Sequence, residues 1–210
     1  MEMIKVVGNE VMKDFNIGKY PVTQQEYEAV MGYNPSCFIG NSDNPVESVN
    51  WYEAIMYCNK LSEQEGLPLY YNITDIIKEK NNITSATVTI LGGAGYRLPM
   101  DEEWVYAAEG GNKSKGYIYS GSDDIDEVAW HKGNSKFITH PVGLKQPNEL
   151  GIYDMTGNVW EWTGTEAEGS VYYVRGGSYE DLEYECEIDN RYTDDTDYGN
   201  EYIGFRVCRS

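Results

Sequence analysis

The last third of the chain constrains the fold most strongly, because its glycines and tryptophans follow one another too closely for a regular helix or strand. Residues 151–162 read Gly-Ile-Tyr-Asp-Met-Thr-Gly-Asn-Val-Trp-Glu-Trp. This spacing matches neither the 3.6-residue period of a helix face nor the two-residue alternation of a strand. Two further blocks, residues 174–178 and 203–207, also contain both glycine and arginine. We therefore expect an irregular C-terminal frame that these three blocks hold in place.

Residues 179–202, between the last two blocks, have a very different composition, and we call them the recognition segment. The segment holds ten acidic residues and five tyrosines but one basic residue, Arg191. Tyrosine offers a large contact area with little rotamer entropy to lose, which suits a binding surface. Carboxylates beside it select basic or hydrogen-bond-donating partners. The segment therefore predicts a site for a protein or other macromolecular ligand, and the alternative is a solvated acidic loop without a partner.

The residues expected to contact the ligand are the tyrosines, aspartates and asparagines of the segment. They are Tyr179, Asp181, Tyr184, Asp189, Asn190, Tyr192, Asp194, Asp195, Asp197, Tyr198, Asn200 and Tyr202. The residues expected to hold this surface in place are Trp160, Trp162, Arg175, Gly176, Gly177, Gly204, Phe205 and Arg206.

Charge and hydropathy exclude several classes of partner. The 210 residues carry a formal net charge of −19, and an acidic surface repels both nucleic acid and an anionic membrane. No stretch is apolar over the length that a membrane span needs. Residues 1–9 show no basic segment followed by an apolar run, so no secretory signal is visible. A cytoplasmic location is the default expectation, with display on a virion or a cell surface as the alternative.

Capping-box patterns predict the first two helices. Thr23 followed by Glu26 begins a helix that should end at Gly32, where glycine permits a left-handed turn. Asn50 followed by Glu53 precedes apolar residues at three-and-four spacing up to residue 61, which is typical of a helix that packs on a core.

The remaining elements are predicted from shorter patterns. A third helix is expected over residues 101–109, and two short strands with a turn near Gly8 are expected within residues 1–22. Strands are expected at residues 69–73 and 86–90, with a polar turn at 78–82. Since the chain shows no linker or internal repeat, we expect one α+β domain over residues 1–210.

Metal sites have little support in the residue spacing. Cys37, Cys58, Cys186 and Cys208 form no close pair and have only two histidines to supplement them, which disfavours zinc and favours free thiols. Three aspartates, at positions 123, 124 and 126, lack the spacing of a calcium loop.

Eight motifs, spread over nearly the whole chain, resemble those of the formylglycine-generating enzyme family, also called the sulfatase-modifying-factor domain. They are KYPVT at 19–23, VNWYEA at 49–54, YRLP at 96–99, EWVYAA at 103–108, HPVG at 140–143, GIYDMTGNVWEW at 151–162, RGGS at 175–178 and GFR at 204–206. The resemblance implies an α+β, C-type-lectin-like fold with few helices, short strands, much irregular loop and a binding surface near the C-terminus.

The resemblance also bears on catalysis. Catalytic members have two cysteines five residues apart after the RGGS block, which bind copper and oxidise a substrate cysteine. Here Cys186 lies eight residues after Ser178, and Arg191, which cannot act as a thiolate ligand, stands five residues later. The departure implies a protein without catalytic residues or a resident cofactor. The alternative is a copper-dependent oxidase of peptide cysteines that uses Cys186.

Two further expectations rest on resemblance. Some proteins with this fold are variable proteins of diversity-generating retroelements, in which a C-terminal stretch rich in Asn, Tyr, Asp, Ser and Thr is randomised, as residues 179–202 would be here. Other members hold calcium around a block matched by Gly157, Asn158, Val159 and Glu161. For Glu161 we favour an ion pair with a buried arginine, Arg175 or Arg206. Calcium-dependent sugar binding at residues 194–197 is a third possible function.

Overall fold

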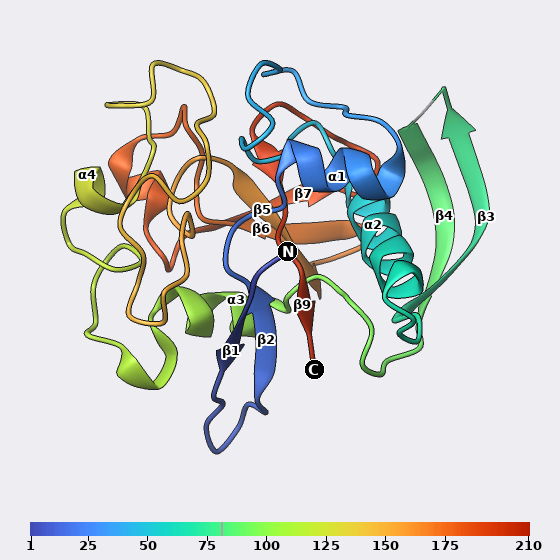
Figure 1. The fold of residues 1–210 in the computed structure, drawn as a ribbon, viewed down its shortest axis with the longest axis horizontal. Helices are drawn as coiled ribbons and strands as arrows, with labels where there is room; N and C mark the ends of the chain where they lie inside the picture. Colours follow the sequence, from blue (N-terminus) through green and yellow to red (C-terminus); the bar gives the residue numbers. More distant parts are fainter. Residues whose placement is uncertain (81) are drawn as a thin grey trace.

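The structure is a computed structural model that describes residues 1–80 and 82–210 (Figure 1). Its helices are short: α1 Gln24–Met31, α2 Trp51–Gln64, α3 Asp101–Ala108 and α4 Ile125–Val128, with 3-10 turns η1 Gly111–Lys113 and η2 Glu183–Cys186. Its strands are β1 Met3–Val6, β2 Phe15–Gly18, β3 Tyr71–Glu79, β4 Asn82–Ile90, β5 Trp160–Glu166, β6 Val171–Arg175, β7 Arg191–Asp195, β8 Ile203–Gly204 and β9 Cys208–Arg209. Irregular loop joins most of these elements, as expected.

Three small antiparallel or mixed sheets organise the chain. Strand β9 pairs with β2, which pairs with β1, so the two ends of the chain meet in one sheet (Figure 1). A separate hairpin of β3 and β4 lies beside α2. The third sheet has the order β7-β6-β5-β8, with β8 parallel to β5. Strand β7 of this sheet belongs to the recognition segment, and β6 and β8 precede and follow the segment in the sequence, so the sheet sets its position.

The two capping boxes form as predicted. Thr23 accepts a hydrogen bond from the backbone of Glu26, and Gly32 ends α1 in the left-handed conformation with φ 86°. Asn50 and Glu53 form the same reciprocal pair at the start of α2. The third helix also forms and ends at Ala108, one residue before its predicted end.

The hairpin differs from its prediction in length. Strands predicted at 69–73 and 86–90 extend over 71–79 and 82–90, with Tyr71 paired to Ile90 and Glu79 to Asn82. Within the predicted turn at 78–82, Lys80 is a turn residue as expected, whereas Lys78, Glu79 and Asn82 are strand, and residue 81 lies outside the described residues. Polar side chains are compatible with strand here because most side chains in this part of the hairpin face solvent.

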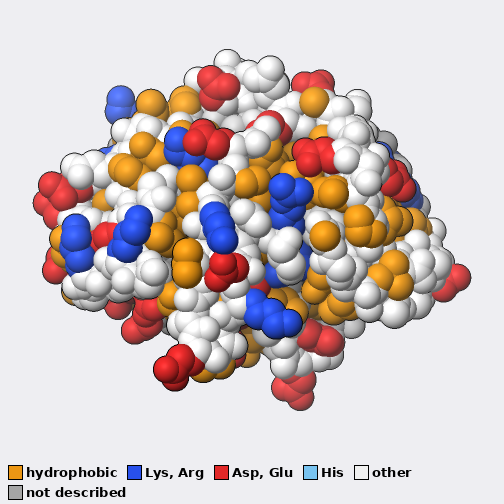
Figure 2. Space-filling view, turned by 60° about the horizontal axis from the view of Figure 1, so that its bottom comes forward, with side chains coloured by type: hydrophobic (Ala, Val, Ile, Leu, Met, Phe, Trp, Pro, Cys, Tyr) orange, Lys and Arg blue, Asp and Glu red, His pale blue; other side chains and the backbone are white. Residues whose placement is uncertain are grey.

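The acidic charge is unevenly distributed over the surface. Figure 2 looks onto the molecule from the bottom of Figure 1 and shows Lys and Arg side chains between hydrophobic ones in the middle of that face, with Asp and Glu mainly near its margin. Among the described residues, no helix has the length and apolar character that crossing a lipid bilayer requires.

A buried ion pair joins the C-terminal blocks to the rest of the protein. Arg206 Nε and Nη2 donate to Glu161 at 2.6 and 2.7 Å, and Trp104 Nε1 donates to the same carboxylate at 2.7 Å. Arg206 also donates to the backbone carbonyl groups of Gly18 and Tyr153. The prediction that Glu161 pairs with a buried arginine is confirmed for Arg206.

We expect the loss of this carboxylate to destabilise the whole fold. In Glu161→Gln, the guanidinium of Arg206 keeps its charge in a fully buried position but loses the carboxylate that it pairs with, which should reduce the free energy of unfolding by about 3–5 kcal/mol. Urea unfolding measures the change. Glu2→Gln is the control, because it breaks an exposed pair with Lys19 and should cost under about 1 kcal/mol. Equal effects of the two substitutions would contradict this account.

Candidate recognition surface

The recognition segment crosses one edge of the β7-β6-β5-β8 sheet and places three tyrosines in solvent. Tyr184, Tyr192 and Tyr198 are 59%, 49% and 52% exposed. The predicted contact residues Asp189, Asp195 and Asp197 are also exposed, whereas Asn190, Asp194, Asp181 and Tyr202 are half-buried. Most of the predicted contact residues thus lie at or near the surface.

The prediction that Tyr179 and Asn200 contact the ligand is wrong, because both residues are buried. Tyr179 is 1% exposed: its ring packs edge-on against Phe38, and its carbonyl group accepts a hydrogen bond from Ser135. Asn200 is 7% exposed, and its carbonyl group accepts from Ser48 N at 2.8 Å. Both residues anchor an end of the segment to neighbouring loops, so they belong to the frame.

A hollow of about 370 Å³ opens beside the exposed Tyr192. Its lining combines aromatic rings with carboxylates and contains no Lys or Arg. The lining residues are Trp160, Val174, Glu180, Asp181, Glu185, Tyr192, Thr193, Asp194, Tyr202 and Ile203. The volume lies in the range of small-ligand sites in proteins.

The sheet register explains how the aromatic part of the hollow forms. Val174 of β6 lies opposite Tyr192 of β7, and Arg175 lies opposite Arg191. Because side chains alternate across a sheet, Val174 and Tyr192 share the face of the hollow, and the two arginines share the other face. The ring of Trp160 meets that of Tyr192 edge-to-face at 5.1 Å.

Asp181 is fixed in the hollow by several hydrogen bonds to one of its oxygens. Trp160 Nε1 donates to Oδ2 at 2.7 Å, and the backbone N–H of Ser178 donates to the same atom at 2.8 Å. The hydroxyl of Ser178 contacts it too. These donors orient the carboxylate, so part of what was predicted as a ligand contact is a structural contact.

The electrostatics of the hollow reflect carboxylates without nearby cations. Within residues 1–80 and 82–210, none of its four carboxylates forms an ion pair. Burial raises the pKa of the Asp194 carboxyl, and the charge of Asp195 adds to the effect. Partial desolvation also raises the pKa of Tyr192, to which the charge of Glu185 contributes. A bound cation would relieve this unbalanced negative charge.

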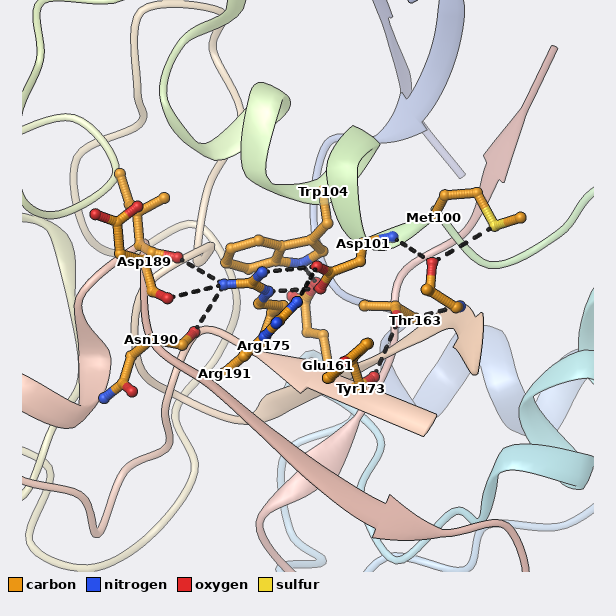
Figure 3. A network of polar contacts seen from close by, with 12 residues as sticks. Met100, Asp101, Trp104, Glu161, Thr163, Tyr173, Arg175, Asp189, Asn190 and Arg191 are labelled. Carbon is orange, nitrogen blue, oxygen red and sulfur yellow. Dashed lines mark hydrogen bonds and ion pairs between the residues drawn. The ribbon is translucent and has the colours of Figure 1, made fainter. Parts of the chain in front are cut away.

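On the other face of the sheet, Arg175 holds the recognition segment from beneath. Its Nε and Nη2 atoms donate to Asp101 of α3 at 2.6 and 2.7 Å, and Figure 3 shows its remaining nitrogen aimed at the segment's backbone. That Nη1 atom donates to the carbonyl oxygens of Ile188, Asp189 and Asn190 at 3.1–3.2 Å. One guanidinium therefore joins a helix, the sheet and the segment.

Gly177 is required where the segment begins. Its φ of 76° is a left-handed conformation, and an added Cβ would lie 2.9 Å from Cα of Cys186. The backbone of the RGGS block consequently passes directly against η2, which a larger residue would push away.

Cys186 lies in a site that suits packing better than chemistry. It is fully buried with Tyr119, Ile125, Val128 and Ala129, and burial raises the pKa of its thiol above the ordinary value. A thiolate is the form that binds copper. The other three cysteines are free as well.

The calcium candidates have other contacts. The carboxylate oxygens of Glu161 already accept from Arg206 and Trp104. Asp124 caps α4, and Asp126 contacts His131. In the part of the chain that the structure describes, no group of three or more His, Cys, Asp or Glu side chains is arranged to hold a metal ion, and this includes residues 194–197.

Comparison with known proteins establishes the family. The sulfatase-modifying factor enzyme 1-like domain matches residues 6–210. The chain belongs to this family. Its relative Treponema denticola variable protein 1 has a solved structure that superposes with a TM-score of 0.82 at 29% identity, covering 99% of this chain and 94% of that one. The structure of CarF superposes with a TM-score of 0.83, also at 29% identity, covering 100% and 98%. The predicted C-type-lectin-like fold is confirmed.

Two curated relatives are similar in sequence. Chaperone protein LppX of Paenibacillus barcinonensis is 49% identical over 177 residues, which are 73% of this chain and 63% of that protein. Inactive C-alpha-formylglycine-generating enzyme 2 of Bos taurus is 30% identical over 134 residues, which are 54% of this chain and 44% of that protein. This chain thus spans less than two thirds of the length of either relative.

Sequence reasoning missed two acidic residues of the hollow, Glu180 and Glu185. The predicted contact residues are all Tyr, Asp or Asn, so they do not include glutamate. Selection by charge alone would have found both. Trp160 was expected only in the frame, yet it also lines the hollow, and nothing in its spacing distinguishes the two roles.

We expect Arg175→Lys to loosen the recognition segment. Lysine cannot donate to Asp101 and to three carbonyl groups together, so buried acceptors lose their partners at a cost of about 1–3 kcal/mol. Hydrogen exchange of peptides spanning residues 183–195 should become faster. Arg191→Lys is the matched control, since its side chain is 49% exposed and it contacts Asp101 at 3.3 Å. Unchanged exchange in Arg175→Lys would refute the role of this arginine.

Proposed function

We propose that this protein is a non-catalytic recognition protein that binds a macromolecular ligand with the exposed side of residues 179–202. The observation that carries the proposal is the aromatic and acidic hollow lined by the exposed Tyr192, in a segment that also exposes Tyr184 and Tyr198 and whose backbone Arg175 binds at residues 188–190. Ordering a flexible side chain on binding costs roughly 0.5–1.5 kcal/mol, and a fixed backbone with tyrosine side chains reduces that cost.

The partner should present basic or hydrogen-bond-donating groups. Four carboxylates line the hollow, and exposed Asp189, Asp195 and Asp197 extend the negative charge beyond it. Such a surface attracts cationic partners and repels acidic ones. Nucleic acid is disfavoured for the same reason.

Three similar proteins and the burial of the Cys186 thiol support a role without catalysis. An inactive formylglycine-generating enzyme, a chaperone protein and a variable protein are all similar to this chain. The buried thiol of Cys186 disfavours the alternative, a copper-dependent oxidase of peptide cysteines, because a second cysteine would have to reach it through the packed cluster around Tyr119. We propose that recognition needs neither copper nor calcium.

The decisive experiment separates binding from stability. Peptides selected from a random display library on the immobilised protein should lose binding by at least about tenfold, or 1.4 kcal/mol, in the triple variant Tyr184→Ala, Tyr192→Ala, Tyr198→Ala. The Tm should change little, because these side chains are about half exposed or more. Binding is measured by interferometry and Tm by calorimetry.

Two control variants complete this test. Tyr179→Ala removes a buried ring and should destabilise the fold by about 3–5 kcal/mol. Tyr117→Ala removes a half-buried ring outside the segment and should leave both binding and stability unchanged. A large loss of Tm in the triple variant would place the three tyrosines in the core and end the proposal.

We further propose that the exposed positions of residues 179–202 are diversified. The exposed tyrosines contribute little to packing, so many residue types fit there, whereas the buried Tyr179 and Asn200 tolerate few. The similarity to a variable protein points the same way. Sequencing the neighbouring DNA tests this: a near-copy of the segment's coding sequence should differ at codons 184, 192 and 198 but match at 179 and 200. Differences spread evenly over buried and exposed codons would count against diversification.

A further inference from the structure

The hollow beside Tyr192 has the chemistry of a site for an organic cation. Aromatic rings attract a cation to their faces, and carboxylates attract it by charge. Here Trp160, Tyr192 and Tyr202 supply the rings, and the carboxylates of Asp181 and Asp194 lie in the same lining. No Lys or Arg side chain lines the hollow to neutralise them.

The carboxylate of Asp181 can accept a hydrogen bond from a ligand in addition to those that it accepts from the protein. Its Oδ2 atom accepts from Trp160 and Ser178, which fixes the plane of the group. In the described residues its other oxygen, Oδ1, has no hydrogen-bond partner. The side chain of Trp160, which orients Oδ2, is only 5% exposed. A donor that enters from solvent can therefore reach one oxygen of an already oriented carboxylate.

Two further carboxylates, those of Glu180 and Asp194, line the hollow. Glu180 is exposed and its side chain makes no hydrogen bond within residues 1–80 and 82–210. Asp194 is half-buried and accepts from the backbone of Asp195 at 2.9 Å. Neither group forms an ion pair within the described residues, so both add negative charge to the lining of the hollow.

We infer that the hollow binds the guanidinium group of an arginine side chain on the partner, a conclusion that rests on the proposed recognition function. Guanidinium is weakly hydrated, stacks on aromatic faces and donates several hydrogen bonds in one plane. It can therefore lie against Tyr192 while donating to Asp181. A lysine ammonium is more strongly hydrated and has no planar face, so it should bind less tightly.

Three short peptides that differ in one side chain test the inference. They are acetylated and amidated Gly-Gly-X-Gly-Gly, where X is arginine, citrulline or lysine. Citrulline has the shape of arginine without its charge. The full-length protein is titrated with each peptide, and the Kd is followed from the indole N–H resonance of Trp160. The arginine peptide should bind at least about tenfold more tightly than citrulline, and salt should weaken it.

Two double variants of equal charge locate the site. Glu180→Gln with Asp194→Asn changes two carboxylates of the hollow and should weaken arginine binding by about tenfold. Glu187→Gln with Asp189→Asn changes two carboxylates of the same segment that line a separate hollow, and it should have little effect. Circular dichroism and Tm confirm that both variants fold.

The outcomes separate this inference from the proposed function. Equal affinity for arginine and citrulline, or equal weakening in the two double variants, overturns the cation site. Tighter binding of lysine than of arginine overturns the guanidinium assignment. Library peptides that lack basic residues but need Tyr184, Tyr192 and Tyr198 would overturn the inference and leave recognition standing. Library peptides that ignore these tyrosines would overturn the proposed function itself.

Discussion

The remaining structure depends on the contacts that the buried carboxylate of Glu161 makes. It binds Arg206 and Trp104, and Arg206 in turn donates to the carbonyl group of Gly18 near the start of the chain. A charge buried without its partner is strongly unfavourable, so these segments can only be buried together. The pair therefore specifies one arrangement of loops that have little regular secondary structure to position them.

The two faces of the C-terminal sheet have different roles: one carries the supporting contacts of a second arginine, and the other is exposed. Arg175 contacts Asp101 and three carbonyl groups on one face, whereas Val174 and Tyr192 line the hollow on the other. Because alternate residues of a strand point to opposite faces, neighbouring positions take on entirely different roles. Substitution on the exposed face leaves the supporting contacts intact, and this is the property that a variable binding surface needs.

The sequence predicts local structure well where one side chain decides it. The boxes at Thr23 and Asn50 form because both partners lie within one turn of chain, and the partner of Glu161 could be narrowed to two arginines. It could not predict that Tyr179 is buried, because Phe38 and Ser135, which cover it, come from loops far away in the chain. The recognition segment is thus visible in composition, while its division into anchors and exposed residues needs the fold.

The same division explains why acidic residues are tolerated so densely in this segment. Unpaired carboxylates repel one another, which disfavours a compact state. Here Asp181 is compensated by Trp160 and Ser178, and the backbone beneath is held by the cation of Arg175 from the opposite face. The contacts of the frame therefore hold the segment in place, although its carboxylates still repel one another. A cationic ligand that enters the hollow removes part of that repulsion, so the segment's own electrostatics favour binding.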